Sequence, residues 1–172
     1  MLYKKICIIG GFAVGKTSLV RRYVLNEFSP DYQATLGVNI YKFTDHIPTR
    51  EGGEITINEI LWDIEGSTTR EETLKTYLRG AAGALVVGDV TRDDVIEDMI
   101  ENARFFSKEL PGRPLVFALN KIDLVEDRDN VENGHALIEE FGGTVLHTSA
   151  AEGTEVPTLF RTLAARVTEI GA

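Results

Sequence analysis

The sequence predicts a single α/β domain over residues 1–172, built on a doubly wound, mostly parallel sheet. Short apolar, β-branched runs alternate along the chain with longer segments of helical period, as in folds made of βαβ units. The apolar runs are continuous rather than alternating, so helices should cover both faces of the sheet. Two further runs flank a Gly-Gly turn at 52–53, which predicts a hairpin and therefore one antiparallel strand at a sheet edge.

The elements follow one another without a linker, an internal repeat or a low-complexity segment. We expect six strands at residues 6–9, 38–47, 55–62, 84–87, 115–119 and 144–146. We expect five helices at residues 16–25, 69–79, 95–110, 131–141 and 156–170. The strand at 38–47 mixes polar with apolar residues and precedes the hairpin turn, so it should be the antiparallel edge strand. The length of 172 residues suits one such domain with one set of flanking helices.

Composition narrows the class of protein further. The 43% of hydrophobic and 26% of charged residues are ordinary for a globular chain and exclude disorder. The net charge of −9 argues against a nucleic-acid binder, whose affinity comes largely from Lys and Arg at phosphates. The single cysteine, Cys7, cannot form an internal disulfide and is expected to be a buried strand residue. No run approaches the ~18 apolar residues of a membrane span. A phosphate ligand would therefore need a local binding device.

Such a device follows the first strand, where residues 10–17 read G-G-F-A-V-G-K-T and match G-x-x-x-x-G-K-[ST]. Glycine at both ends lets the backbone wrap closely enough for several N–H groups to face one phosphate. The helix that follows adds the positive end of its dipole. Lys16 would reach the β- and γ-phosphate oxygens, and the Thr17 hydroxyl would bind Mg²⁺. The sequence therefore predicts a P-loop nucleotide-binding domain.

Three more motifs stand at the carboxyl ends of expected strands, where α/β sheets bind their ligands. They are D-x-x-G at 63–66, N-K-x-D at 120–123 and T-S-A at 148–150. Together with the phosphate loop, and in this order, they resemble the Ras-like small GTPases over essentially the whole chain. Within that superfamily the chain is most similar to the Rab branch, on W-D at 62–63 and Y-L-R-G-A at 77–81 before D-V-T at 89–91. The resemblance implies a GTPase (G) domain.

The resemblance also implies how the base is read. Asp123 would accept hydrogen bonds from the guanine N1–H and exocyclic amine, whereas adenine would leave this carboxylate unpaired. Asn120 would join this loop to the phosphate loop, and Lys121 would stack over the ring. The backbone N–H of Ala150 would bind the guanine O6, and Ser149 would support Asp123.

The segment after the first helix resembles switch I, and the segment from the D-x-x-G motif resembles switch II. Thr35 would complete the Mg²⁺ coordination and contact the γ-phosphate, while Phe28 would pack on the base and Tyr32 would cover the phosphates. Asp63 would hold Mg²⁺ through a water, and the Gly66 N–H would contact the γ-phosphate. Loss of the γ-phosphate would therefore relax both segments. The nucleotide-binding set implied in this way is Gly11, Phe12, Ala13, Val14, Gly15, Lys16, Thr17, Ser18, Phe28, Tyr32, Thr35, Gly66, Asn120, Lys121, Asp123, Ser149, Ala150 and Ala151.

Three positions depart from the family pattern, and all of them bear on hydrolysis. The glutamine that orients the attacking water is replaced by Ser67, and the one glutamine of the chain is Gln33. Phe12 stands where a small residue is usual, as does Glu65. We therefore expect the chain to bind GTP and GDP with Mg²⁺ but to hydrolyse GTP slowly.

The catalytic assignment accordingly stays open at one point. The resemblance gives Lys16, Thr35 and Gly66, with Ser67, Gln33, Glu65 or a group from an activating protein as candidates for orienting the water. A second hypothesis is a GTP-dependent signalling scaffold that does not hydrolyse. A third, a P-loop ATPase or small-molecule kinase, is disfavoured by the N-K-x-D motif and by the lack of a lid segment.

Protein effectors and an activating protein are the expected partners, through residues 35–40 and 63–79. Trp62 and Phe43 could form an apolar patch for such partners, although Trp62 fits core packing equally well. The sequence ends without a cysteine or a polybasic stretch, so we expect no lipid anchor. We expect a cytoplasmic protein that is a monomer or a GTP-dependent dimer, and no nucleic-acid partner.

Overall fold

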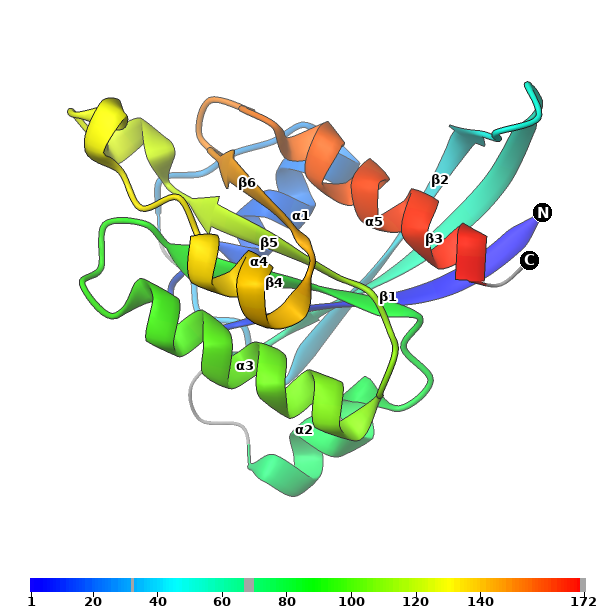
Figure 1. Ribbon diagram of the computed structural model, residues 1–172, viewed down its shortest axis with the longest axis horizontal. Helices are drawn as coiled ribbons and strands as arrows, with labels where there is room; N and C mark the ends of the chain where they lie inside the picture. Colours follow the sequence, from blue (N-terminus) through cyan, green and yellow to red (C-terminus); the bar gives the residue numbers. More distant parts are fainter. Residues whose placement is uncertain (32, 67–69, 171–172) are drawn as a thin grey trace.

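In the computed structural model, which describes residues 1–31, 33–66 and 70–170, six strands form one sheet in the order β2-β3-β1-β4-β5-β6 (Figure 1). All neighbouring strands are parallel except β2 and β3, which are antiparallel at the edge. The predicted six-stranded, mostly parallel sheet with one antiparallel edge strand and five helices is therefore confirmed. The elements are β1 (Leu2–Gly10), α1 (Lys16–Leu25), β2 (Val38–Pro48), β3 (Glu54–Ile64), α2 (Glu71–Leu78), β4 (Gly83–Asp89), α3 (Val95–Glu109), β5 (Leu115–Asn120), the 3₁₀ turns η1 (Ile122–Leu124) and η2 (Arg128–Asn130), α4 (His135–Phe141), β6 (Thr144–Thr148) and α5 (Val156–Ile170).

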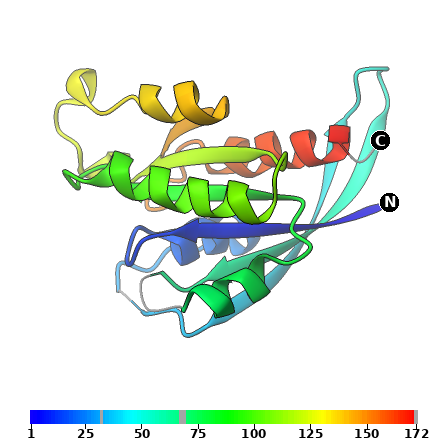
Figure 2. The same cartoon turned by 60° about the horizontal axis from the view of Figure 1, so that its bottom comes forward.

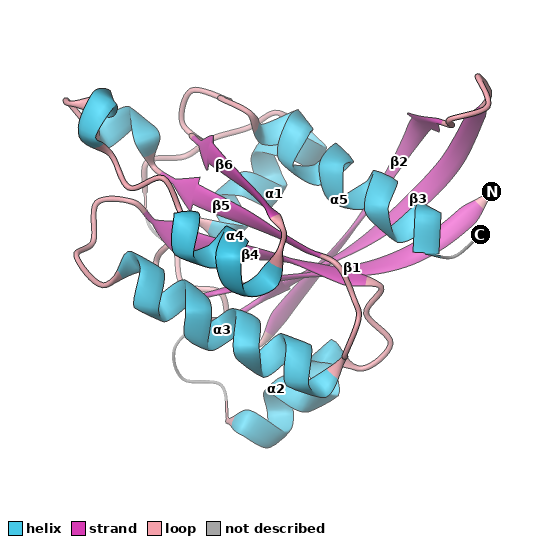
Figure 3. Cartoon of the chain, viewed as in Figure 1, coloured by secondary structure: helices cyan, strands magenta, loops and turns pink. Residues whose placement is uncertain are grey.

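Helices cover both faces of the sheet, and each face has its own apolar core (Figure 3). Helices α1 and α5 pack on one face, where Leu19, Phe160 and Leu163 are completely buried. Helices α2, α3 and α4 pack on the other, with Met99 and Phe106 of α3 as buried anchors. Among the helices that the structure describes, none is long and apolar enough to cross a bilayer.

Burial along the strands follows from this two-sided covering. Every residue of β4 and β5 is buried, as the continuous apolar runs predicted. Strand β2 instead alternates between exposed and half-buried residues over most of its length, as an edge strand should. The sheet is therefore most completely buried in β4 and in β5, the strand that leads to the N-K-x-D motif, whereas β6 is mostly half-buried.

The hairpin of β2 and β3 is longer than predicted. Both strands have 11 residues and meet in a turn where the Thr49 N–H donates to the Gly53 carbonyl at 2.8 Å. The hairpin projects beyond the rest of the sheet, at the end where β1 starts and α5 ends (Figure 2). Strand β3 also runs on to Ile64, so Asp63 belongs to the strand rather than to the loop after it. The pairing of β3 with β1 and β2 therefore fixes the position of Asp63.

The helix predicted over residues 131–141 was placed too early, because α4 starts only at His135. The Glu132 carboxylate accepts the Gly134 N–H at 2.9 Å, and the Asn133 side-chain oxygen accepts the His135 N–H at 2.9 Å. These side chains satisfy the backbone donors locally and hold a turn in place of a helix. Gly134 itself has a φ of 72°, which ends any helical continuation from the N-terminal side. Helix α2 is likewise shorter than the predicted 69–79.

Candidate nucleotide-binding site

The phosphate loop leaves β1 at Gly10 and enters α1 at Lys16, at the carboxyl edge of the sheet. Gly15 has a φ of 102° and lies against the Asn120 carboxamide, so a side chain there would be strained and would collide. The Lys16 side chain is 6% exposed and its Nζ donates to the carbonyl oxygens of Gly10 at 3.1 Å and Gly11 at 2.6 Å. The loop thus curls around its own lysine.

Burial lowers the pKa of Lys16 to about 8, although the nearby carboxylates of Asp63 and Asp98 act in the opposite direction. The ammonium is held in a desolvated position where an anionic ligand would be bound strongly. Phosphate groups bound in the loop would favour the charged form of this lysine.

Three oxygen-bearing side chains converge beside the loop. The Thr17 hydroxyl donates to Asp63 Oδ2 at 2.6 Å and lies 2.6 Å from the Thr35 hydroxyl. Asp63 is fully buried, and its Oδ1 has no hydrogen-bond partner among the described residues. Burial raises the pKa of Asp63, which the hydrogen bond from Thr17 partly offsets. Hydroxyl and carboxylate oxygens are the ligands that Mg²⁺ prefers, so this trio fits a magnesium ion. No cluster of three or more His, Cys, Asp or Glu side chains elsewhere in the described chain offers another metal site.

The start of the expected switch II touches the phosphate loop through backbone atoms. A Cβ at Gly66 would lie 2.7 Å from the Gly11 carbonyl oxygen and from the Phe12 nitrogen, so only glycine fits there. Glu65 joins the two expected switches: its N–H donates to the Gly37 carbonyl at 2.9 Å, and its Oε2 accepts the Gly37 N–H at 3.0 Å. The Glu65 carboxylate thus contacts switch I, a contact that the sequence did not reveal.

The base-binding motifs form one hydrogen-bonded unit. Asn120 Nδ2 donates to the Val14 carbonyl at 3.0 Å, which is the link to the phosphate loop expected for this residue. Asn120 Oδ1 accepts the Thr148 hydroxyl at 3.0 Å, and Asp123 Oδ1 accepts the Ser149 hydroxyl at 2.7 Å. These hydrogen bonds connect the carboxyl ends of β5 and β6 to each other and to the phosphate loop.

Lys121 adds a second bridge across the site. Its backbone has a φ of 68°, and its Nζ donates to the Ala13 carbonyl at 2.7 Å and pairs with Asp89 Oδ2 at 2.9 Å. Its aliphatic stem therefore spans the region beside the phosphate loop. Asp89 was not predicted as a site residue, although it ends strand β4 just as Asn120 ends β5. Its place at the carboxyl end of an expected strand was the sequence signal that could have identified Asp89 as a site residue.

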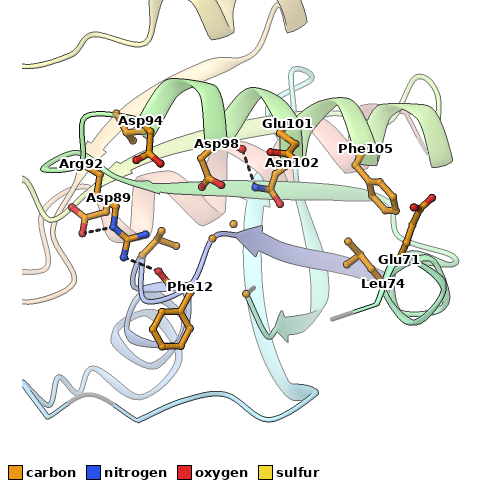
Figure 4. A pocket seen from close by; sticks show the side chains of 15 residues that line it. Phe12, Glu71, Leu74, Asp89, Arg92, Asp94, Asp98, Glu101, Asn102 and Phe105 are labelled. Atoms are coloured by element: carbon orange, nitrogen blue, oxygen red, sulfur yellow. Dashed lines mark hydrogen bonds and ion pairs between the residues drawn. The ribbon is translucent and has the colours of Figure 1, made fainter. Parts of the chain in front are cut away.

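A groove of about 440 Å³ adjoins the phosphate loop on the side of α2 and α3 (Figure 4). Arg92 donates from Nη2 to the Phe12 carbonyl at 2.7 Å, and its Nε lies 3.5 Å from Asp89 Oδ2. The ring of Phe12 is half-exposed and points away from α3 (Figure 4). The rest of the lining is glycine, apolar side chains, Asn102 and four carboxylates: Glu71, Asp94, Asp98 and Glu101. Arg92 and its contacts were not expected from the sequence.

Of the other predicted site residues, Phe28 and Gln33 are exposed, and Ser18 is half-buried at the start of α1. Tyr32 and Ser67, assigned to the phosphate cover and to the missing glutamine position, lie outside the described residues. Ala150 and Ala151 follow Ser149 directly, with Ala150 4% exposed.

The expected patch of Trp62 with Phe43 is wrong. Phe43 faces the α1 and α5 side, where its ring lies 4.3 Å from that of Tyr23. Trp62 faces the opposite side of the sheet and is paired in register with Ile40, which is 54% exposed. Adjacent positions on a strand point to opposite faces, so the odd residue 43 cannot join the even residue 62 across this antiparallel pair.

Comparison with known proteins agrees with this geometry. Residues 5–169 match the model of the Ras family. The chain is 39% identical to the Ras-related protein RABA5e of Arabidopsis thaliana over 160 residues, covering 91% of this chain and 70% of that protein. It is 37% identical to RABA5c of the same plant, covering 91% and 72%, and 32% identical to RABA2d over 168 residues, covering 96% and 75%. The similarity to the Rab branch that the motifs indicated is confirmed.

Proposed function

The chain belongs to the Ras family of GTP-binding small GTPases, and from this membership we propose that it is a guanine-nucleotide switch that binds Mg²⁺ with GTP or GDP and hydrolyses GTP slowly unless a partner assists. The observation that carries the proposal is the connected set Asn120, Asp123 and Ser149 beside a complete phosphate loop. A generic phosphate-binding loop does not require such a set, whereas these three side chains are suited to selecting the base.

Guanine selection would rest on Asp123. One of its oxygens is already fixed by the Ser149 hydroxyl, which orients the carboxylate toward a ligand that offers two adjacent donors. Guanine offers N1–H and an exocyclic amine on one edge. Adenine offers an acceptor at N1, so it would leave a half-buried carboxylate facing a lone pair, at a cost of about 1–3 kcal/mol or more. This is the reason to prefer a GTPase over the ATPase or kinase alternative.

The phosphates would be held by the loop amides and by Lys16. The hydroxyl oxygens of Thr17 and Thr35 would hold Mg²⁺ directly, and Asp63 would hold it through a water. When bound, the ion neutralises charge on the β- and γ-phosphates. Water would attack the γ-phosphorus in line, the bond to the β–γ bridging oxygen would break, and GDP and phosphate would leave. Lys16 and the backbone N–H of Gly66 would stabilise the charge that develops on these oxygens.

Slow hydrolysis is proposed because the position after Gly66 carries Ser67 instead of a water-orienting glutamine. Gln33 is exposed in the switch I segment, and the Glu65 carboxylate is engaged with the Gly37 N–H. Phe12, half-exposed at the phosphate loop, would narrow the entry for an arginine from an activating protein, a group worth about 10³–10⁵ in rate. A protein that dwells in its GTP state as a signalling scaffold is the alternative that these features favour.

Partners would bind at residues 35–40 and 63–79, where the GTP and GDP forms would differ. Ile40 and Trp62 lie side by side there, the Trp62 ring lies 6.4 Å from that of Tyr77, and Lys5 Nζ lies 3.6 Å above the Trp62 ring. An apolar patch of this kind suits a protein effector. We propose a monomer, with GTP-dependent dimerisation as the alternative. We place it in the cytoplasm without a nucleic-acid partner, since a charge of −9 opposes binding to anionic polymers and membranes.

The deciding experiment is the nucleotide content of the purified protein, read by chromatography, followed by single-turnover GTP hydrolysis with and without Mg²⁺. We expect bound GDP or GTP, displacement by GTP but not by ATP, and a rate below that of family members that keep the glutamine. Equal displacement by ATP would overturn the guanine assignment. A rate equal to those family members would overturn slow hydrolysis, and no turnover at all would favour the scaffold. An unchanged rate in Gln33→Ala would remove Gln33 as the substitute group.

A further inference from the structure

We propose that Arg22 is a positioning residue for guanine recognition: from α1 it holds two carbonyls of the loop after β6 and thereby aims the Ala151 N–H of that loop at the base. This inference rests on the proposed guanine binding and adds a residue to it. Arg22 belongs to none of the motifs that identify the site. Its partners lie 128 and 129 residues away in the sequence.

The guanidinium of Arg22 is committed to this loop. Its Nε donates to the Ala150 carbonyl and its Nη2 to the Ala151 carbonyl, both at 2.7 Å. Its Nη1 lies 3.3 Å from Asn26 Oδ1 at the end of α1, which steadies the side chain. Two parallel N–H donors on a planar group fix direction as well as distance. Arg22 therefore fixes the orientation of two successive peptide planes.

The orientation of those planes determines where the amides point. In a trans peptide the carbonyl oxygen and the following N–H lie on opposite sides of the chain. With the Ala150 carbonyl turned toward Arg22, the Ala151 N–H must face away from α1. The same rule turns the Glu152 N–H away, and it is indeed found donating to the Ser149 hydroxyl at 3.0 Å. The carbonyls of Ala150 and Ala151 thus face α1, and the N–H groups that follow them face the opposite side of the loop.

Among the described residues, neither the Ala150 amide nor the Ala151 amide donates a hydrogen bond. Ala150 is only 4% exposed, and an unpaired buried donor costs about 1–3 kcal/mol. The guanine O6 is an acceptor that would satisfy such donors, next to the edge that Asp123 would read. Arg22 therefore orients the Ala151 N–H for O6, while Ser149 orients the acceptor for N1–H and the amine. The Ala150 N–H belongs to the preceding peptide, whose carbonyl Arg22 does not contact.

Loss of Arg22 should spare the rest of the loop. The Ser149 N–H still donates to the Thr154 carbonyl at 3.1 Å, and the Ser149 hydroxyl still reaches Asp123. We therefore expect the effect of removing Arg22 to concentrate on the O6 contact and not on the Asp123 edge. This separation distinguishes positioning from general support of the fold.

The test measures the affinity of the full chain for three diphosphates, in the wild type and in the variants Arg22→Lys and Arg22→Gln. GDP is compared with inosine diphosphate, which lacks the exocyclic amine, and with 6-thio-GDP, which weakens the acceptor at O6. We expect the Arg22 variants to bind GDP about 10-fold more weakly, as loss of one or two hydrogen bonds implies. Their penalty for 6-thio-GDP should shrink, while their penalty for inosine diphosphate should stay at the wild-type value.

Arg21→Lys is the matched control, because Arg21 is exposed on the same helix and pairs with Glu27 at 2.9 Å. It should leave all three affinities unchanged. Thermal unfolding of each variant checks that it folds, and Arg22→Lys keeps the charge if Arg22→Gln does not fold. Equal changes in both analogue penalties, or no change in either, would overturn the positioning role. A wild type that does not prefer GDP to ADP would instead overturn the proposed function, and this inference with it.

Discussion

The base end and the γ-phosphate end of the site differ in how far the protein builds them in advance. At the base end, Asn120, Thr148 and Ser149 are at most 1% exposed. Asn120 is hydrogen-bonded to the phosphate loop, Thr148 to Asn120, and Ser149 to Asp123. At the γ-phosphate end, Thr35 is half-buried and Leu36 beside it is 85% exposed. The base end is part of the packed sheet edge. The γ-phosphate end combines the buried side chains of Lys16 and Asp63 with Thr35, which lies on a largely exposed loop.

Because of this difference, we expect nucleotide affinity to depend mainly on the base end and switching mainly on the γ-phosphate end. Groups that are already oriented lose little conformational entropy on binding, so the base end should supply affinity equally to GDP and GTP. A segment with little packing of its own can be ordered by a ligand and released again. Substitutions at the base end should therefore change binding of both nucleotides, whereas those at the other end should change turnover or state.

The largest effect is expected at Asp123. Asp123→Ala removes two hydrogen bonds to a charged acceptor, each worth about 1.5–3 kcal/mol, so GDP and GTP affinity should both fall by about 10²–10⁴. Titration calorimetry or displacement of a fluorescent GDP measures the change. Asp129→Ala, at the exposed turn η2, is the control and should bind normally. A loss below tenfold, or a loss for GTP alone, would contradict the claim that the base end supplies affinity equally to GDP and GTP.

The next effect concerns turnover. Ser67→Gln places a carboxamide where the family orients water, and we expect single-turnover GTP hydrolysis to rise by about 10- to 100-fold with GDP affinity unchanged. Thr73→Gln, exposed on α2, controls for adding a glutamine to this region. If Ser67→Gln has no effect, Phe12→Gly in the same background tests whether the bulky ring blocks the water. A rate that stays flat in both would assign slow turnover to another cause.

The sequence predicted some residues of the site and missed others, for a physical reason. Motifs consist of residues that are close together in the chain, so the phosphate loop could be recognised from its spacing, and the resemblance to the Ras-like small GTPases then implied the roles of Asn120 and Asp123. Arg22 and Asp89 touch their partners only because the sheet brings distant segments together, and no local pattern marks such contacts. The position of Glu65 was visible as a departure from the family, but its bond to Gly37 required the fold.

The fold shows the same division. Continuous apolar runs and the Gly-Gly turn predicted the strand types and the antiparallel edge, because these depend on local composition. The start of α4 was missed, since side-chain hydrogen bonds from Glu132 and Asn133 override helical period. Phe43 was placed on the wrong face because the side-chain alternation of β2 only acquires a direction once its register with β3 is known.

A smaller effect follows from Lys16, which serves both nucleotides through the phosphates. Burial lowers its pKa to about 8 in the free protein, and bound phosphates must raise it because they favour the ammonium. Binding then takes up a proton near and above pH 8. GDP affinity should be constant below about pH 7 and fall by up to about tenfold per unit above pH 8. Guanosine, which lacks phosphates but shares the ionisable N1–H of the base, is the control, and its affinity should fall less steeply than that of GDP. A flat profile for GDP would contradict the assignment.

The smallest effect on binding is expected from a buried acid away from both ends. Glu59 on β3 is fully buried, and burial raises its pKa to about 8 despite the hydrogen bond from the Tyr23 hydroxyl at 2.8 Å. The charges that face it are Asp45 of β2 and Arg161 of α5, which pair with each other at 2.9 Å. Its folded pKa lies above its unfolded value. The folded state therefore binds a proton at Glu59 more tightly than the unfolded state does. The resulting stability is fully present below about pH 4.5 and is lost as the pH rises toward 8.

Glu59→Gln should remove this loss by keeping the group neutral. Between pH 5 and 8 the wild type should lose about 1–3 kcal/mol more of its unfolding free energy than the variant, measured by urea denaturation. Glu54→Gln, exposed on the same strand, is the control and should follow the wild type. GDP affinity should be the same in all three proteins, because Glu59 touches neither end of the site. If Glu59→Gln shifted GDP affinity, the two ends would be coupled through β3, and the division between a preformed and a ligand-ordered end would have to include the strand that carries Asp63.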